Sequence, residues 1–388
     1  MKYLDEFRDG ELARGMARNI AATVVEDRSY RFMEFCGGHT HAISRYGLTD
    51  LLPPQLTMIH GPGCPVCVLP IGRVDLAIEL ALQNDVILCS YGDTLRVPAS
   101  NGLSLAKAKA GVGARRADVR MIYSSAEALA LARAHPERQV VFFAIGFETT
   151  TPPTAVVIRQ AAQLGLANFS VLCCHVLTPP AITHILSLPQ EPQSAGVAID
   201  GFIGPAHVST VVGSRPYEFV AEKYRKPVVI AGFEPLDLLA AILMLVKQVN
   251  AGVARVENQF SRAVTREGNL KAQDLVATVF EMRREFEWRG LGTVPYSALQ
   301  IREPYAAFDA ERRFALVYKP VADNKACECG AILRGVKRPS DCKVFGMACT
   351  PEMPLGSCMV SSEGACAAHY TYGRFRGPSP QPPSRGRG

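Results

Sequence analysis

Two cysteines separated by two residues stand out near the start of the chain. The segment IHGPGCPVCVLP (59–70) carries Cys64 and Cys67, with Pro65 in the turn between them. Such a pair can exchange with a disulfide, supply two thiolates to a metal ion, or be two inert buried thiols. The spacing alone leaves all three interpretations open.

A second candidate site lies just upstream, in the segment FCGGHTHAI (35–43). It places Cys36, His39 and His41 around the Gly37-Gly38 turn. A thiolate close to an imidazole can bind a metal or act as a nucleophile with its base. The alternative is a buried cysteine with surface histidines, and the Cys-x-x-Cys pair nearby makes that alternative weaker.

Six more cysteines gather in a Gly- and Pro-containing segment near the end of the chain: Cys327, Cys329, Cys342, Cys349, Cys358 and Cys366. Zinc ribbons usually carry two Cys-x-x-Cys knuckles, which this segment lacks. Widely spaced single cysteines suit a [4Fe–4S] cluster, which four thiolates hold. We therefore favour an iron–sulfur cluster over zinc or structural burial. Two of the six cysteines are left over and could form a redox pair.

A carboxylate also occupies a position that could do chemistry. The segment GFETTTPP (146–153) places Glu148 directly after an apolar run. This residue could act as a general base, anchor a ligand or cap a helix. No phosphate-binding glycine motif of the GxGxxG or Walker type occurs in the chain, so nucleotide binding has no motif support.

The elements that position these residues follow an α/β pattern. Helix-like stretches at 73–83 and 125–135 have an apolar face at helical spacing, and Ser124 or Ser125 could cap the second. Seven short runs are apolar throughout, as expected for strands of a parallel sheet that is covered on both faces. They lie at 56–61, 85–92, 119–124, 139–147, 168–176, 199–204 and 226–233. Function in such sheets gathers at the carboxyl ends of strands, where the motifs above fall.

The length of 388 residues predicts two or three domains. We expect two small parallel-sheet α/β domains around a cleft, domain I at 36–137 and domain II at 138–248. A third domain, mostly helical and loop-rich, would combine 1–35 with 249–376 and carry the cysteine cluster. The tail 377–388 is rich in Pro, Gly, Ser and Arg and is predicted to be disordered. One large sheet of seven strands is the alternative.

Composition narrows the function classes. The net charge of +6 reflects 42 basic against 36 acidic residues, with no basic block, so we expect no nucleic-acid partner. The N-terminus lacks an apolar signal region, and the longest apolar run, 236–249, is too short to span a bilayer. We therefore predict a cytoplasmic protein with no membrane partner, in which cysteines serve metal or redox chemistry.

Taken in order, four motifs resemble those of the HypD family of hydrogenase maturation factors. They are FCGGHTH, HGPGCPVC, GFETTTP and the C-terminal CECG…C…C…CMVSSEGAC. The resemblance covers the whole chain except the tail. It departs from the family pattern at Phe260, where a tyrosine is usual. The family fold that it implies has two α/β domains facing a cleft and a third domain with a [4Fe–4S] cluster.

The resemblance implies a function as well. Members of this family are scaffolds for the Fe(CN)2CO group of [NiFe]-hydrogenases. They work with a small HypC-type chaperone, receive cyanide from the HypE/HypF pair, and so serve the hydrogenase large subunit indirectly. Whether such a scaffold counts as an enzyme is open, although redox activity is expected.

By motif, each candidate residue then takes a role. Cys36 would bind the transient Fe(CN)2CO iron with His39 beside it, Cys64 and Cys67 would be the redox-active pair, and Glu148 would belong to the catalytic cleft. The family spacing C-x14-C-x6-C-x16-C fits cluster ligands at Cys327, Cys342, Cys349 and Cys366. Cys329 and Cys358 would relay electrons.

One hypothesis concerns how cyanide is held. Because glycine lets the backbone approach a ligand closely, the N–H groups of Gly37, Gly38, Gly61 and Gly63 could donate hydrogen bonds to cyanide nitrogens. Two other functions stay open: a cluster-dependent thiol–disulfide oxidoreductase, which gives Cys36 and His39 no task, and a zinc-stabilised binding module.

Overall fold

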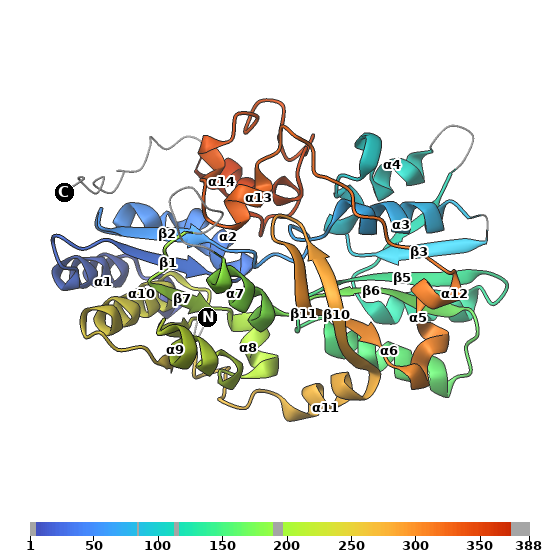
Figure 1. The fold of residues 1–388 in the computed structure, drawn as a ribbon, viewed down its shortest axis with the longest axis horizontal. Coiled ribbons are helices and arrows are strands. Elements are labelled where there is room, and N and C mark those ends of the chain that lie inside the picture. The colour runs from blue at the N-terminus through green and yellow to red at the C-terminus, as the bar shows by residue number, and fades with distance from the viewer. Residues whose placement is uncertain (1–4, 84, 112–115, 189–196, 374–388) are drawn as a thin grey trace.

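Two parallel β-sheets form the frame of the molecule. The computed structural model describes residues 5–83, 85–111, 116–188 and 197–373. In Figure 1 the two sheets lie on opposite sides of the molecule, with helices α13 (Cys329–Leu333) and α14 (Ala365–Tyr372) above the region between them. The predicted α/β class and the pair of parallel sheets are confirmed.

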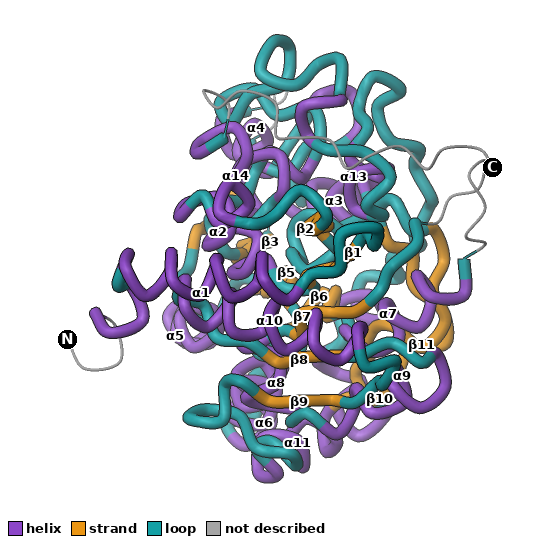
Figure 2. Tube along the Cα trace, turned by 90° about the vertical axis from the view of Figure 1, so that its left-hand side faces the viewer, coloured by secondary structure: helices purple, strands orange, loops and turns teal. Residues whose placement is uncertain are grey.

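The first sheet has five parallel strands. In spatial order they are β2 (Leu56–His60), β1 (Tyr30–Glu34), β7 (Gly201–Gly204), β8 (Val228–Ile230) and β9 (Val256–Asn258). Helices α1 (Gly10–Thr23) and α10 (Pro235–Asn250) lie side by side and share a buried apolar core with this sheet (Figure 2). Pro235 occupies the first turn of α10, where its missing N–H costs nothing, and Glu234 and Asp237 form a capping box.

The second sheet has four parallel strands, in the order β4 (Asp118–Met121), β3 (Val86–Ser90), β5 (Gln139–Gly146) and β6 (Phe169–His175). All residues of β3 and β6 are buried, which explains why these runs are apolar throughout. Helix α5 (Ser125–Ala134) begins after Ser124, whose hydroxyl accepts from the Ala126 N–H, as the sequence indicated.

The remaining helices are α2 (Gly37–Tyr46), α3 (Ile71–Ala81), α4 (Leu105–Ala110), α6 (Thr151–Gln163), α7 (Thr178–Ser187), α8 (Ala206–Val212), α9 (Glu218–Tyr224), α11 (Leu270–Val279), α12 (Ala310–Arg313), α13 (Cys329–Leu333) and α14 (Ala365–Tyr372). None of the helices in the described part of the chain is both long and apolar enough to cross a membrane.

The seven predicted strands are all present, but the sheets do not divide at the predicted boundaries. Residue 137 lies inside the second sheet, because β3 pairs with both β4 and β5. The first sheet joins β1 to β7, so it combines residues from the predicted domains I, II and III. The chain crosses from the first sheet to the second after β2 and returns to the first sheet before β7. The order of the strands in the sequence does not indicate this crossing.

The segment after α10 contains a feature that we did not predict. Strands β10 (Phe280–Trp288) and β11 (Gly292–Ile301) form an antiparallel hairpin in a region expected to be helical. The hairpin contacts the second sheet, where Leu177 N–H donates to Ser297 O. Trp288 is fully buried and donates to the Ser297 hydroxyl. The hairpin thus adds to the core of the molecule.

The tail 377–388, predicted to be disordered, lies outside the described residues.

Candidate functional site

Cys36 lies at the carboxyl end of β1 and forms the N-cap of α2. Its side chain is almost fully buried. Burial, followed by repulsion from Glu363 and Glu34, raises the pKa of the Cys36 thiol to about 12, although N–H groups of Gly38 and His39 oppose this shift. At neutral pH the free site therefore holds a thiol, and a metal that binds there must displace its proton.

The Cys-Pro-Val-Cys loop lies directly against Cys36. Cys64 and Cys67 are joined in a disulfide, and both are buried. The N–H of Gly37 donates to the carbonyl of Gly63 at 3.0 Å. A Cβ added to Gly63 would lie 2.3 Å from the backbone nitrogen of Cys36, so only glycine allows the two loops to cross this closely.

Glu34, which the sequence analysis overlooked, ties both loops together. It is fully buried at the end of β1, and its carboxylate accepts from the Cys36 N–H at 3.0 Å and from the Thr40 hydroxyl. Its Oε1 also lies 2.9 Å from Nδ1 of His60 at the end of β2. The Gly61 N–H donates to its backbone carbonyl. A buried carboxylate with this many donors fixes the position of the surrounding backbone.

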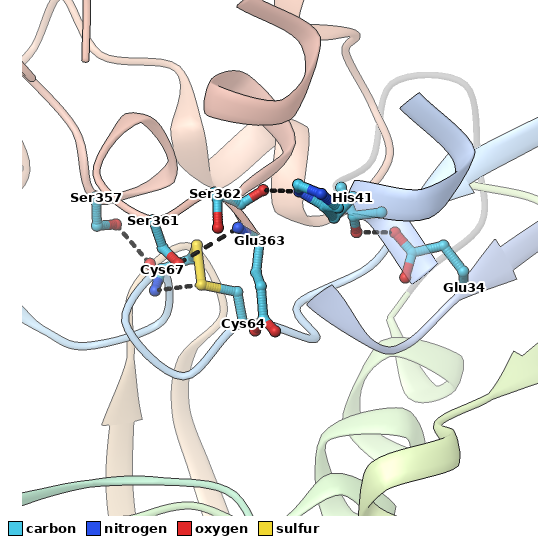
Figure 3. The surroundings of a disulfide bond; sticks show 9 residues. Glu34, His41, Cys64, Cys67, Ser357, Ser361, Ser362 and Glu363 are labelled. Carbon is cyan, nitrogen blue, oxygen red and sulfur yellow. Dashed lines mark hydrogen bonds between the residues drawn. A yellow bond between two sulfur atoms is a disulfide. The ribbon is translucent and has the colours of Figure 1, made fainter. Parts of the chain in front are cut away.

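The C-terminal segment covers this site (Figure 3). The Ser357 hydroxyl donates to the carbonyl of Cys67 at 2.6 Å, and Nδ1 of His41 lies 3.2 Å from the carbonyl of Ser362. The Glu363 carboxylate lies against Gly37, where an added Cβ would be 2.7 Å from its Oε2. Burial, with Asp93 and Glu34, raises the pKa of Glu363. Glu363 belongs to the SSEGAC motif, but its type and spacing alone did not indicate this position beside Gly37.

His39 lies on the first turn of α2, fully buried, with its ring 5.2 Å from that of Phe233. Its Nε2 is 3.0 Å from the carbonyl of Ala231, and its Nδ1 has no partner. Burial lowers the pKa of His39, which favours a neutral ring. Because a carbonyl only accepts, we assign the proton to Nε2, which leaves Nδ1 as an acceptor.

The hypothesis that glycine N–H groups donate to cyanide is wrong for three of the four groups. Those of Gly37, Gly61 and Gly63 donate to carbonyls of Gly63, Glu34 and Gly61, respectively. That of Gly38 faces the Cys36 sulfur. The glycines serve the close crossing of the loops, and their N–H groups are not free for a ligand.

Glu148 follows β5 of the second sheet and is surrounded by different residues. Its carboxylate accepts from the Thr178 N–H at 2.7 Å and from the Thr178 hydroxyl at 3.0 Å. Burial raises the pKa of Glu148 to about 7. It lines a mostly apolar cavity of about 550 Å³ with residues of α8, α11 and the hairpin, and none of the residues lining this cavity belongs to the Cys36 loops.

Four of the six C-terminal cysteines contact one another. The side chain of Cys329 lies close enough to those of Cys327, Cys358 and Cys366 to interact with each of them. A Cβ on Gly356 would lie 2.3 Å from the Cys327 sulfur, so this glycine leaves room for the sulfurs. The predicted ligands and the predicted relay cysteines thus lie in one cluster of thiols.

The cysteine cluster has the donors that the expected [4Fe–4S] group needs. Within the described residues, no three His, Cys, Asp or Glu side chains converge closely enough to hold a single ion. A [4Fe–4S] cluster does not require three ligands at one point, because each of its four irons binds its own thiolate. Cys349 stands close enough to both Cys327 and Cys342 to interact with them electrostatically, and Cys329, Cys349 and Cys366 are shielded from water. The donor set therefore fits the group.

Comparison with known proteins identifies the family. Residues 11–373 match the family described as "HypD: Hydrogenase formation hypA family". The chain is 67% identical over 376 residues to the hydrogenase maturation factor HypD of Cupriavidus necator, covering 97% of this chain and 98% of that protein. It is 44% identical over 377 residues to the protein of the same name from Escherichia coli K12, covering 96% and 98%. The chain therefore belongs to the HypD family of hydrogenase maturation factors.

Proposed function

We propose that the protein is the scaffold on which the Fe(CN)2CO group of [NiFe]-hydrogenases is assembled, with the iron held on Cys36. The observation that carries this proposal is the meeting of three motifs at one buried thiol. The Cys-Gly-Gly-His loop, the Cys-Pro-Val-Cys loop and the C-terminal segment with Glu363 all contact one another there. Sulfur is a soft ligand that suits low-spin iron.

The Fe(CN)2CO group needs a second protein to hold it. Cys36 is a single thiolate donor, and its neighbour His39 offers only Nδ1. A HypC-type chaperone would contribute a further thiolate from outside, and the HypE/HypF pair would deliver cyanide. The loaded chaperone would then carry the group towards the hydrogenase large subunit.

Electrons would pass through the protein's own sulfur groups. Cys327, Cys342, Cys349 and Cys366 would hold a [4Fe–4S] cluster, which when bound supplies one electron at a time. Opening the Cys64–Cys67 disulfide takes two electrons and two protons. Ser357, which donates to the Cys67 carbonyl, directly precedes Cys358 of the thiol cluster. The segment that covers the disulfide therefore continues directly into the thiol cluster, and Cys329 and Cys358 would relay electrons between the two redox centres.

The cytoplasm is the compartment that we propose for this chemistry. Ten of the cysteines are unpaired in the structure, and a reducing environment keeps such thiols free.

A cluster-dependent thiol–disulfide oxidoreductase is the second candidate. The existing Cys64–Cys67 disulfide favours it, but the burial of both sulfurs counts against exchange with a large protein substrate. A thiolate must approach a disulfide sulfur directly, and at this position the C-terminal segment is in the way.

Infrared spectroscopy of the protein co-purified anaerobically with its small chaperone tests the proposal. Metal-bound CO and cyanide bands that disappear in Cys36→Ala are expected, with thiol exchange at Cys64 and Cys67 retained. A wild-type protein that contains iron, reduces disulfides and shows no such bands would instead establish the oxidoreductase.

A further inference from the structure

The cavity at Glu148 has no task in the proposed assembly of the Fe(CN)2CO group. Its volume of about 550 Å³ falls within the range of small-molecule sites in proteins. Helices α8 and α11 and the β10–β11 hairpin supply most of its walls, through residues such as Val211, Val276 and Leu299. Figure 1 shows α11 at the lower edge of the molecule and α13 and α14 in its upper part. A site here would therefore act separately from the Cys36 loops.

The polar side chains that line this cavity are largely occupied by the protein itself. The Thr151 hydroxyl donates to the backbone carbonyl of Glu148 at 2.9 Å, and Nε of Arg302 donates to that of Phe280 at 3.1 Å. The amide nitrogen of Gln273 donates to two backbone carbonyls, at 2.7 and 2.8 Å. Among the charged lining residues, Glu148 is 5% exposed, whereas Arg302 is open to solvent. The charge of the cavity interior is therefore that of the Glu148 carboxylate.

The Glu148 carboxylate can take a further donor. Each of its oxygens accepts one hydrogen bond from Thr178, from the N–H at 2.7 Å and from the hydroxyl at 3.0 Å. A carboxylate oxygen has two lone pairs, so one on each oxygen remains. Both of these partners are neutral, and burial raises the pKa of Glu148 to about 7 although donation from Thr178 opposes the shift. An ionised carboxylate in this position would be stabilised by a positive charge placed beside it.

A β-bulge shapes the rim of the cavity. Tyr296 and Ser297 lie opposite the single residue Arg284, where the pairing of β10 and β11 shifts. Tyr296 has a φ of 53°, in the left-handed region that disfavours residues with a side chain. Its ring lines the cavity together with Met282, and both side chains are more than half exposed. Bulges and strained residues are frequent beside binding sites because they re-aim a side chain.

We infer that this cavity binds a small organic amine, whose ammonium group donates a hydrogen bond to the Glu148 carboxylate while its apolar body packs against the aliphatic walls. The charge of Glu148 favours a cation and opposes an anion at this depth. A hydrogen bond between two charged groups is also stronger than one between neutral groups. The inference does not depend on the scaffold function, and it gives Glu148 of the GFETT motif a task away from Cys36.

Isothermal titration calorimetry of the full chain, purified anaerobically without its chaperone, tests the inference. The probes are 2-phenylethylamine, the neutral 2-phenylethanol and the anionic 3-phenylpropionate, which have similar shapes. We expect wild type to bind the amine roughly tenfold more tightly than the alcohol. Glu148→Gln should reduce the affinity for the amine to that for the alcohol. Glu137→Gln is the matched control, because the Glu137 side chain is 65% exposed, and it should keep the preference for the amine.

A second pair of variants tests the cavity without touching the carboxylate. Ala277 of α11 lines the cavity, so Ala277→Trp should fill it and abolish binding of the amine. Thr278 is the next residue, is exposed and does not line the cavity, so Thr278→Trp should bind as wild type does. Melting midpoints of all variants show whether each one folds. This pair keeps the inference testable if Glu148→Gln fails to fold.

Three results would overturn the inference. Equal affinity of wild type for the amine and the alcohol would exclude recognition of a cation. A preference for 3-phenylpropionate that disappears in Arg302→Gln would make the cavity an anion site. No binding of any probe, or binding that Ala277→Trp leaves unchanged, would show that the cavity is not the site. Since no probe requires iron or cyanide, these results leave the scaffold function untouched, and a failed infrared test would leave this inference standing.

Discussion

Replacing Glu34 should weaken the frame of the site more than any exposed carboxylate could. Glu34→Ala removes the acceptor for the Cys36 N–H, the Thr40 hydroxyl and Nδ1 of His60. Cys36 and Thr40 are buried, so water cannot replace the lost acceptor at once. Each buried donor left unpaired costs about 1–3 kcal/mol. Since the Thr40 hydroxyl can rotate towards another acceptor, we expect a total loss of roughly 3–5 kcal/mol in the free energy of unfolding.

The isosteric variant separates hydrogen bonding from packing. Glu34→Gln keeps one carbonyl oxygen for the Cys36 N–H, and its amide can donate to the Thr40 oxygen, so we expect a loss of about 1 kcal/mol. Glu137→Ala is the control, because the Glu137 side chain is 65% exposed and its contact with His135 is a surface pair. That variant should differ from wild type by less than about 0.5 kcal/mol.

Two assays test the prediction for Glu34→Ala. Thermal melting under anaerobic conditions should show a drop of roughly 5–10 °C for Glu34→Ala, since long chains shift by only a few degrees per kcal/mol. Iodoacetamide should label Cys36 faster in the same variant, because the loop opens and a charge that raises the pKa of Cys36 is gone. If Glu34→Ala melted and labelled as Glu137→Ala does, Glu34 would not hold the loops and the reasoning would fail.

Three further predictions concern other parts of the molecule. Gly356→Ala should abolish the visible absorbance of the proposed iron–sulfur cluster, because its methyl group would collide with two cysteine sulfurs. Gly15→Ala in α1, where the added methyl group makes only an ordinary contact with Arg18, should leave the absorbance unchanged. Glu148→Gln should become more stable relative to wild type as pH rises from 5 to 8. Burial raises the folded pKa of Glu148 from 4.5 to about 7, so the free energy of unfolding of wild type falls by up to roughly 3 kcal/mol across that window. Melting midpoints of the two proteins that run parallel with pH would contradict this. Reduction of Cys64–Cys67 should cost about 2 kcal/mol or less, since the loop it closes is very short, and a collapse of the melting midpoint in dithiothreitol would show a larger structural role.

The regular strands were predictable because burial on both faces leaves a continuous apolar run in the sequence. All seven predicted runs became strands. The strand YRFME was overlooked because Arg31 and Glu34 interrupt its apolar pattern, although Tyr30 and Phe32 alternate as in a strand. The hairpin β10–β11 was misread for a similar reason, since its exposed face is charged and resembles an amphipathic helix.

Pairing between strands distant in the sequence could not be read from local patterns. That β1 lies between β2 and β7 depends on long-range packing, and this pairing places the sheets across the predicted domain boundary. The candidate residues were recognisable by type, and three of their motifs do meet at Cys36. The partner that orients them was not recognisable, because the buried environment of Glu34 is created only by the fold.

The way in which the C-terminal segment covers the site has a consequence for synthesis of the protein on the ribosome. His41 contacts Ser362 across a separation of 321 residues, and Cys67 contacts Ser357 across 290. The N-terminal loops therefore emerge long before the segment that covers them. A nascent chain exposes Cys36 without its cover until near the end of translation. The order of synthesis thereby leaves Cys36 uncovered until the thiol cluster has also been made.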